Sequence, residues 1–237
     1  MAIVGELGIG KTLTLTYIGW ENWFYRGRKI YSNYTLYGVP FTPIKTLNDL
    51  KKMIPSETPT LEQLMETKEI VFLGDELWRW CDSRLAVMDV SEKERKKIRN
   101  KIVADILGAS RKAFVTVVYT TQTMSQVDKR IREVTDFTVY PIIKGDIVHA
   151  PVFMGSNPKA PAIEKVIRFY KEPFYAIFNT YERIQPLEEG EDKPLQEIVI
   201  PIRQNPAWIY YLKKFKNLED EQIEKETKYV EKMLLVK

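Results

Sequence analysis

Apolar runs alternate with amphipathic segments along the first 140 residues, and this alternation predicts an α/β fold. The apolar runs predict strands at residues 2–4, 28–34, 69–76 and 113–119. The amphipathic segments predict helices at residues 13–26, 48–54, 61–65 and 91–107, the last capped by Ser91, and residues 40–43 predict a turn. Strands that alternate with helices in this way indicate a mostly parallel, doubly wound sheet with helices on both faces.

The pattern changes after residue 134. Short apolar segments predict further strands at residues 137–143, 147–153, 173–178 and 198–202. The acidic stretch at residues 187–194 reads as a solvated loop, and Pro206 opens a helical tail. We therefore expect a core at residues 1–186 and, at residues 187–237, a C-terminal strand and helical extension that packs on the core or on a neighbouring subunit.

The segment between the first strand and the first helix fits the pattern G-x-x-x-x-G-K-[ST] of a phosphate-binding loop. Glycines let backbone N–H groups turn toward an anion, and the following helix adds its positive N-terminus. Lys11 is expected to reach the β- and γ-phosphates, and the Thr12 hydroxyl to bind Mg²⁺. The expected nucleotide-binding residues are Gly5, Glu6, Leu7, Gly8, Ile9, Gly10, Lys11, Thr12 and Leu13.

Two acids, Asp75 and Glu76, end the strongest predicted strand, at residues 69–76. Asp75 at the carboxyl end of a buried strand can hold Mg²⁺, and Glu76 can activate the attacking water. The alternative is that the two acids only begin a helix, where they complement the helix dipole. The phosphate-loop motif favours the catalytic interpretation.

Gln122 ends the next buried strand. Its amide can contact the γ-phosphate or the attacking water. The alternative is an amide that caps a helix beginning at Ser125. The phosphate loop, the two acids and Gln122 each follow a predicted buried strand, in this order along the chain. We therefore favour the functional interpretation of Gln122.

Composition limits the remaining classes. The chain has 237 residues, with 36 Lys and Arg against 32 Asp and Glu, so its charge permits binding to an acidic polymer without arguing for it. The chain has a single cysteine, which excludes an internal disulfide framework. It also has a single histidine, so the residues that usually bind zinc are too few for a zinc site. We find neither eighteen consecutive apolar residues nor a secretory signal, so we expect no membrane span and a cytoplasmic protein.

Together these motifs resemble the additional-strand P-loop ATPases of the FtsK–HerA superfamily. Local features resemble its zonula-occludens-toxin-like branch of filamentous phages and archaeal viruses and plasmids. They are Tyr31-Ser32-Asn33-Tyr34, Asp75–Trp80 with Arg84, Ser110-Arg111-Lys112 before the strand to Gln122, and Phe178–Glu182. The match covers residues 1–182.

The resemblance implies an Mg²⁺-dependent ATPase that forms a ring, expected to be a hexamer, and moves double-stranded DNA. A neighbouring subunit would supply an arginine to the transferred phosphoryl group. Arg111 is the candidate, and Arg84, Arg130 and Arg132 are rivals. The function expected is viral genome packaging in the host cytoplasm, with a capsid or membrane assembly component as a possible further partner. The alternatives are a virion assembly and extrusion ATPase of the filamentous-phage type and a nucleotide-dependent structural module with little turnover.

Overall fold

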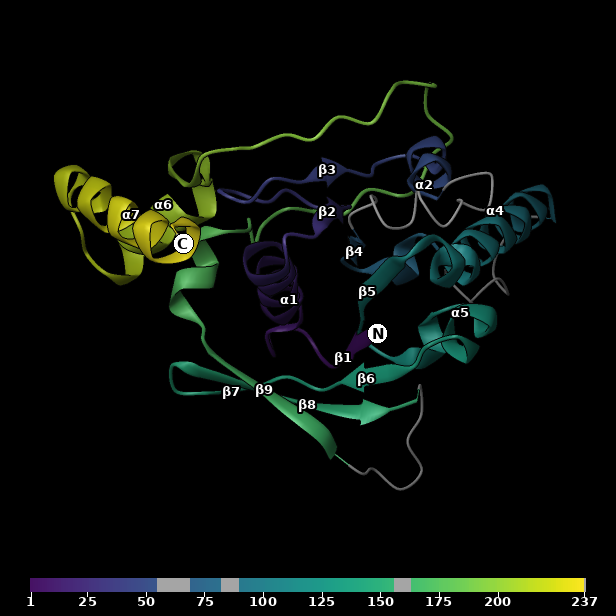
Figure 1. The fold of residues 1–237 in the computed structure, drawn as a ribbon, viewed down its shortest axis with the longest axis horizontal. Helices are drawn as coiled ribbons and strands as arrows, with labels where there is room; N and C mark the ends of the chain where they lie inside the picture. The colour runs from purple at the N-terminus through teal and green to yellow at the C-terminus, as the bar shows by residue number, and fades with distance from the viewer. Residues whose placement is uncertain (55–68, 82–89, 156–162, 237) are drawn as a thin grey trace.

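The computed structural model describes residues 1–54, 69–81, 90–155 and 163–236, so the predicted helix at 61–65 lies outside the described residues. One sheet of nine strands organises the chain (Figure 1). Its order is β3-β2-β4-β5-β1-β6-β8-β7, and β9 pairs with β8. The strands are β1 (Ala2–Val4), β2 (Lys29–Ser32), β3 (Thr42–Pro43), β4 (Ile70–Gly74), β5 (Val115–Thr121), β6 (Phe137–Val139), β7 (Ile142–Lys144), β8 (Ile147–Met154) and β9 (Ile163–Tyr170).

The six strands from β3 to β6 are parallel. β5 lies between β1 and β4, so the strand that leads into the phosphate loop and the strand that delivers the two acids are separated by one strand. Ile3 pairs with Thr120 on β5, and Leu73 pairs with Val118. The carboxyl ends of β1, β4 and β5 therefore meet at one edge of the sheet, where ligands of open α/β sheets bind.

Helices cover both faces of this parallel part, which confirms the expected fold class. Alternate strand residues enter two cores: Ile3 and Leu73 pack under α1 (Lys11–Arg26), while Phe72 and Tyr119 pack on the other face. Burial on both faces explains why these strands read as continuous apolar runs. The second face is covered by α2 (Leu47–Met53), α4 (Val90–Ala109) and α5 (Lys129–Glu133).

The far side of the sheet is antiparallel. β8 pairs antiparallel with β6, β7 and β9. The single strand expected at 137–143 is two strands, because the chain breaks around Pro141, a residue without a backbone N–H. β9 had no counterpart in the sequence prediction. Most of its residues are exposed, so it lacks the alternation by which a half-buried strand is recognised.

Three predicted elements are wrong. Residues 173–178 hold a 3₁₀ helix, η4 (Glu172–Ala176), because Pro173 fits the first turn of a helix better than a strand interior. Residues 198–202 form one bridge, between Ile198 and Phe41, before η5 (Ile202–Gln204). The turn expected at 40–43 contains the two-residue strand β3. In addition, α4 already includes Val90, so Ser91 lies within the helix and does not precede its first residue.

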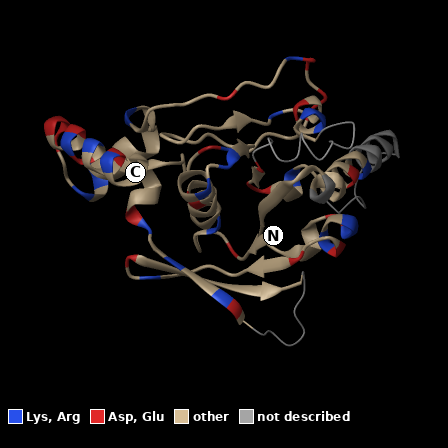
Figure 2. Cartoon of the chain, viewed as in Figure 1, with Lys and Arg blue, Asp and Glu red and all other residues tan. Residues whose placement is uncertain are grey.

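The C-terminal extension forms α6 (Pro206–Phe215) and α7 (Asp220–Leu235). These helices share the hydrophobic core of α1: Trp208 is fully buried, and the Trp20 indole donates to the Leu234 carbonyl at 2.7 Å. The stretch at 187–194 is tethered at its start, where Leu187 is buried and Leu47 N donates to Glu188 O at 2.7 Å. Both charge signs are interspersed along α7 (Figure 2). No helix in the described ranges has the length and apolar character that crossing a membrane requires.

Candidate functional site

The phosphate loop connects β1 to α1 in six residues. Gly5 has φ of 148°, and a Cβ there would lie 1.9 Å from Ile9 Cδ1, so any larger residue would displace that side chain. Gly10 precedes the helix with φ of 93°, a left-handed conformation that glycine adopts without strain. The loop thus presents the N-terminus of a sixteen-residue helix at the carboxyl edge of the sheet, as anion binding requires.

Lys11 is the first residue of α1 and is half-buried. Its Nζ donates to the carbonyl oxygen of Glu6 at 2.7 Å, which places the ammonium group within its own loop. Burial lowers the pKa of Lys11, and the nearby carboxylates of Asp75 and Glu76 oppose that shift. A cation held in this way is available to the oxygens of a phosphate chain.

Thr12 and Asp75 meet across the site. The Thr12 hydroxyl donates to Asp75 at 3.1 Å from Oδ1 and 3.2 Å from Oδ2. Thr120, near the end of β5, donates to Asp75 Oδ1 at 2.6 Å. Asp75 is buried, and this burial raises its pKa, while the hydrogen bonds from Thr120 and Thr12 lower it and the charge of Glu76 raises it further. Two hydroxyls therefore hold a buried carboxylate whose burial disfavours its charge.

Asn33 fixes the backbone of Asp75 from the other side. Its Nδ2 donates to Asp75 O at 2.8 Å, and Asp75 N donates to Asn33 Oδ1 at 2.7 Å. Asn33 follows β2, the parallel neighbour of β4. The motif Tyr31-Ser32-Asn33-Tyr34 contains this residue but does not predict the contact. The signal that identifies it is a carboxamide at the carboxyl end of the strand beside the acidic strand end.

Glu76 stands in an unusual backbone conformation, with φ of 44° and ψ of 46°. Non-glycine residues in this region cost about 1–3 kcal/mol, and such residues cluster at functional sites. The Glu76 amide donates to Thr120 Oγ1 at 2.8 Å, and its carboxylate pairs with Arg79, one turn further on in η1 (Leu77–Arg79). Glu76 directly precedes η1, so its pair with Arg79 also fits the alternative that the acids begin a helix, whereas its contact with Thr120 joins it to the neighbouring strand β5.

A hollow of about 370 Å³ adjoins these groups. Eight of the expected nucleotide and catalytic residues line it: Leu7, Gly8, Gly10, Lys11, Thr12, Leu13, Asp75 and Glu76. Gly5, Glu6 and Ile9 belong to the loop without lining the hollow. Its remaining walls are Thr120, Ile143, Tyr175, Phe178, Thr180 and Glu182. The site is thus completed by a late segment that includes part of the motif Phe178–Glu182.

Glu182 ties this late segment to the strand ends. Its carboxylate accepts from Thr35 N and from Thr35 Oγ1, each at 2.9 Å. The two residues are 147 positions apart, so only the folded sheet brings them together. This contact fixes the wall of the hollow beside Asn33 and Asp75.

Gln122 lies just past β5, beside Gly5 of the phosphate loop, whose amide donates to Thr121 O at 3.3 Å. Gln122 is partly buried and does not line the hollow. The residue of this strand end that contacts the two acids is Thr120. The sensor role of Gln122 remains a prediction.

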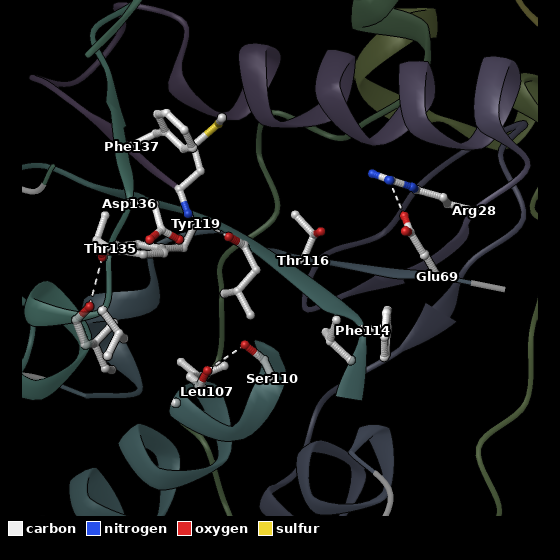
Figure 3. A pocket seen from close by; sticks show the side chains of 16 residues that line it. Arg28, Glu69, Leu107, Ser110, Phe114, Thr116, Tyr119, Thr135, Asp136 and Phe137 are labelled. Atoms are coloured by element: carbon white, nitrogen blue, oxygen red, sulfur yellow. Dashed lines mark hydrogen bonds and ion pairs between the residues drawn. The ribbon is translucent and has the colours of Figure 1, made fainter. Parts of the chain in front are cut away.

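Arg111 belongs to η2 (Ser110–Ala113), before β5. Seven strand residues, spanning roughly 20 Å, separate this turn from the phosphate-loop edge. Ser110 lines a second hollow, of about 430 Å³, at the amino ends of the strands, near Phe114 and Glu69 (Figure 3). Arg111 therefore lies at the edge of the sheet opposite its own phosphate loop.

Two of the rival arginines lie on α5, and Arg84 lies outside the described residues. Arg130 is paired with Asp128, at 2.9 Å from Nε to Oδ1, and this guanidinium lowers the pKa of Asp128. Arg132 lies one turn below Thr135, close enough to Tyr119 to influence its pKa. Arg130 is thus paired within its own subunit. That Arg111 acts on the nucleotide of a neighbouring subunit stays a prediction.

The donor set fits Mg²⁺. This ion takes oxygen ligands, keeps several waters, and is usually bound through one or two carboxylates and substrate phosphates. The Thr12 hydroxyl and the Asp75 carboxylate supply such oxygens side by side. In the described part of the chain no group of three or more His, Cys, Asp or Glu forms a metal cluster. Phosphate oxygens and water would therefore supply the other ligands.

The fold is similar to several solved structures. The N-terminal domain of zonular occludens toxin from Neisseria meningitidis is 16% identical, with a TM-score of 0.46 over 75% of this chain and 97% of that one. The genome packaging NTPase B204 from Sulfolobus turreted icosahedral virus 2, in complex with ATP-γS, is 9% identical, with a TM-score of 0.43 over 70% of this chain and 94% of that one.

The conjugation coupling protein TcpA of pCW3, in its monomer form with ATPγS, is 12% identical, with a TM-score of 0.45 over 72% of this chain and 59% of that one. The solved structures that are similar to this chain thus include a zonular occludens toxin domain and a viral genome packaging NTPase. The sequence matches no protein-family model and no curated protein.

Proposed function

We propose that this protein is an Mg²⁺-dependent ATPase that works in a ring, expected to be hexameric, and translocates double-stranded DNA during viral genome packaging. One observation carries the nucleotide part of this proposal. The phosphate-loop residues Lys11 and Thr12 meet the acid Asp75 in one hollow, with the Thr12 hydroxyl 3.1 Å from the Asp75 carboxylate. This is the arrangement that binds a phosphate chain and its magnesium ion.

Each residue has a defined task in this proposal. The backbone amides of the loop and Lys11 bind the β- and γ-phosphates. Thr12 and Asp75 hold Mg²⁺, which supplies charge neutralisation at the phosphates when it is bound. Glu76 orients the attacking water and accepts its proton. In this structure the Glu76 carboxylate is paired with Arg79 through Oε2, so Oε1 would be the oxygen that accepts the proton.

Hydrolysis supports a motor when a neighbouring subunit completes the site. Arg111 lies at the edge of the sheet opposite its own phosphate loop. From this position of the backbone we assign Arg111 to the nucleotide site of an adjacent copy. Ring closure through such head-to-tail contacts gives one nucleotide site per interface. The DNA and the packaging role rest on the sequence resemblance.

Steady-state ATP hydrolysis tests the proposal. Wild type and Glu76→Gln are assayed with and without double-stranded DNA, with Glu221→Gln as control, because Glu221 is an exposed acid on α7. We expect DNA to stimulate wild type and the control equally, and the Glu76→Gln variant to lose at least about a hundredfold in turnover. If wild type hydrolysed ATP at the same rate with and without DNA, the proposed motor role would be wrong. Turnover unchanged in Glu76→Gln would remove the assigned chemistry.

A further inference from the structure

A second hollow adjoins the nucleotide site. It measures about 250 Å³ and lies between η4 and α6. Three of its lining residues, Tyr175, Phe178 and Thr180, also line the phosphate-loop hollow. The two hollows therefore meet along one segment of chain, and a ligand anchored at Lys11 can extend from one toward the other.

The walls of this second hollow are aromatic. Besides the shared residues they comprise Tyr181, Ala207, Tyr210, Tyr211 and Phe215. The Tyr181 and Tyr210 rings meet edge to face with centroids 5.9 Å apart, and Tyr210 lies 6.4 Å from Phe215. These three rings remain 63%, 41% and 67% exposed. Exposed aromatic faces in a preformed hollow are suited to a flat heteroaromatic ring.

One buried side chain fixes the shared wall to the C-terminal extension. Asn205 Nδ2 donates to the carbonyls of Ala176 and Phe178, each at 2.9 Å, and more weakly to Tyr175 at 3.3 Å. Its Oδ1 accepts from Ala207 N at 3.0 Å at the start of α6. The wall and the helix that face one another across the hollow are thus held by the same residue, so the hollow is a built feature of the fold.

We infer that this aromatic hollow binds the nucleoside end of the nucleotide, and that the C-terminal extension thereby completes the site. The planes of Tyr210 and Phe215 meet at 76°, so the purine ring would stack on one of them and meet the other edge to face. The inference rests on the proposed nucleotide function, and it adds the part that no phosphate-loop motif specifies. Base stacking on aromatic side chains is tolerant of sequence and supplies affinity without hydrogen-bond readout. The phosphate loop then sets the position of the triphosphate and the extension sets that of the base.

Two ligands separate these contributions. Dissociation constants for Mg·ATP and for Mg·tripolyphosphate, which has no base, are measured by calorimetry on the full chain. The variants are Tyr210→Ala and Phe215→Ala, whose exposure allows truncation without opening the core. Tyr229→Ala is the matched control, because Tyr229 is 61% exposed on α7 and lines neither hollow. We expect each variant to bind Mg·ATP about tenfold more weakly and tripolyphosphate as wild type does.

Each other outcome has a distinct meaning. Equal ATP affinity in wild type and in both variants would overturn the inference, as would an equal loss for both ligands. Weaker binding of an oligo-dT strand with ATP binding intact would also overturn it and assign the hollow to DNA bases. Failure of the proposed function is separate: wild type would bind neither ligand, or Lys11→Ala would bind tripolyphosphate as tightly as wild type.

Discussion

The Asn33 carboxamide holds the backbone of Asp75 through both of its polar atoms, at 2.8 Å and 2.7 Å. β2 and β4 are parallel neighbours, and these two hydrogen bonds join their carboxyl ends. They thereby fix the position of the two acids that follow β4. A backbone strained at Glu76 needs such a support, because it occupies a conformation that costs free energy.

Asn33→Ala is therefore expected to lower activity more than stability alone explains. It leaves the Asp75 N–H and C=O without their partners, which costs about 2 kcal/mol in free energy of unfolding. It also frees the acids to shift, and a misplacement of about 1 Å costs about a hundredfold in turnover. Urea unfolding and steady-state hydrolysis at a temperature where both proteins are folded measure the two effects.

The control for this variant is Asn48→Ala, since Asn48 also donates to one backbone carbonyl, that of Gly190, at 2.9 Å near the surface. It should keep full turnover and lose less than about 1 kcal/mol. If Asn33→Ala turned over as fast as Asn48→Ala, the clamp would have no role in placing the acids.

Asp75→Asn should stabilise the protein while it abolishes hydrolysis. Burial raises the pKa of folded Asp75 above its usual 3.8, so the folded state keeps its proton longer than the unfolded state as pH rises. The Asp75 contribution to the free energy of unfolding is therefore fully present below pH 3.8 and is lost as pH rises through the folded pKa. The asparagine variant has no such loss.

Urea unfolding between pH 4 and pH 8 measures this difference. The stability of Asp75→Asn relative to wild type should grow with pH and then level off. Asp146→Asn, at an exposed carboxylate paired with Lys171, is the control for the substitution itself. A relative stability that fell with pH would show that the hydroxyls of Thr12 and Thr120 outweigh burial at Asp75.

Arg111→Ala should reduce turnover by about a thousandfold while leaving ATP affinity unchanged, if Arg111 acts on the neighbour's phosphate. The distinguishing experiment mixes it with Glu76→Gln subunits, each inactive alone. A Glu76→Gln subunit still supplies Arg111, and an Arg111→Ala subunit still supplies Glu76. Mixed rings should regain up to about a quarter of wild-type activity by statistics of the interfaces.

The control for that mixture is Arg130→Ala, because Arg130 is already paired with Asp128. It should retain turnover without complementation. Failure of the Arg111→Ala and Glu76→Gln mixture to regain activity, with ring assembly confirmed by sedimentation, would exclude Arg111 as the trans-acting residue.

Local patterns were enough to predict the strand–loop–helix unit at Gly5 to Thr12 and the acids at the end of β4, because adjacent residues determine both. The contacts that assemble the site are not local. Asn33 and Asp75 are 42 positions apart, and Thr120 and Asp75 are 45 apart. Their pairing depends on the order of strands, which a single sequence does not state. The sequence pattern predicts Gln122 as the functional residue of its strand end, and the structure adds Thr120, which contacts Asp75 and Glu76.

The late segment was harder to predict for a different reason. Residues 173–178 are apolar because they pack against α1 and α6, and burial in a 3₁₀ turn resembles burial in a short strand. The aromatic residues of α6 carry the same ambiguity. Trp208 is fully buried whereas Phe215 is 67% exposed, although both belong to one apolar stripe. The difference lies in what α7 and η4 cover.

Asn205 links the late segment to the start of α6. Its substitution should distinguish the contribution of each contact to stability. Asn205→Ala removes the donor to the Ala176 and Phe178 carbonyls and the acceptor that caps α6, so we expect a loss of about 3 kcal/mol or more in free energy of unfolding. Asn205→Thr keeps a capping oxygen without the amide donor, so it should recover about 1 kcal/mol of that loss.

Urea unfolding of the two variants measures how much the α6 cap contributes to the free energy of unfolding. The ATP dissociation constant measures how much the hold on the Ala176 and Phe178 carbonyls contributes to nucleotide binding. Both variants lose the hold on the Phe178 carbonyl, so both should weaken ATP binding equally, even though their stabilities differ. ATP affinity that followed stability, recovering with the threonine, would instead mean that α6 acts through its helical order and not through the wall at Tyr175 and Phe178.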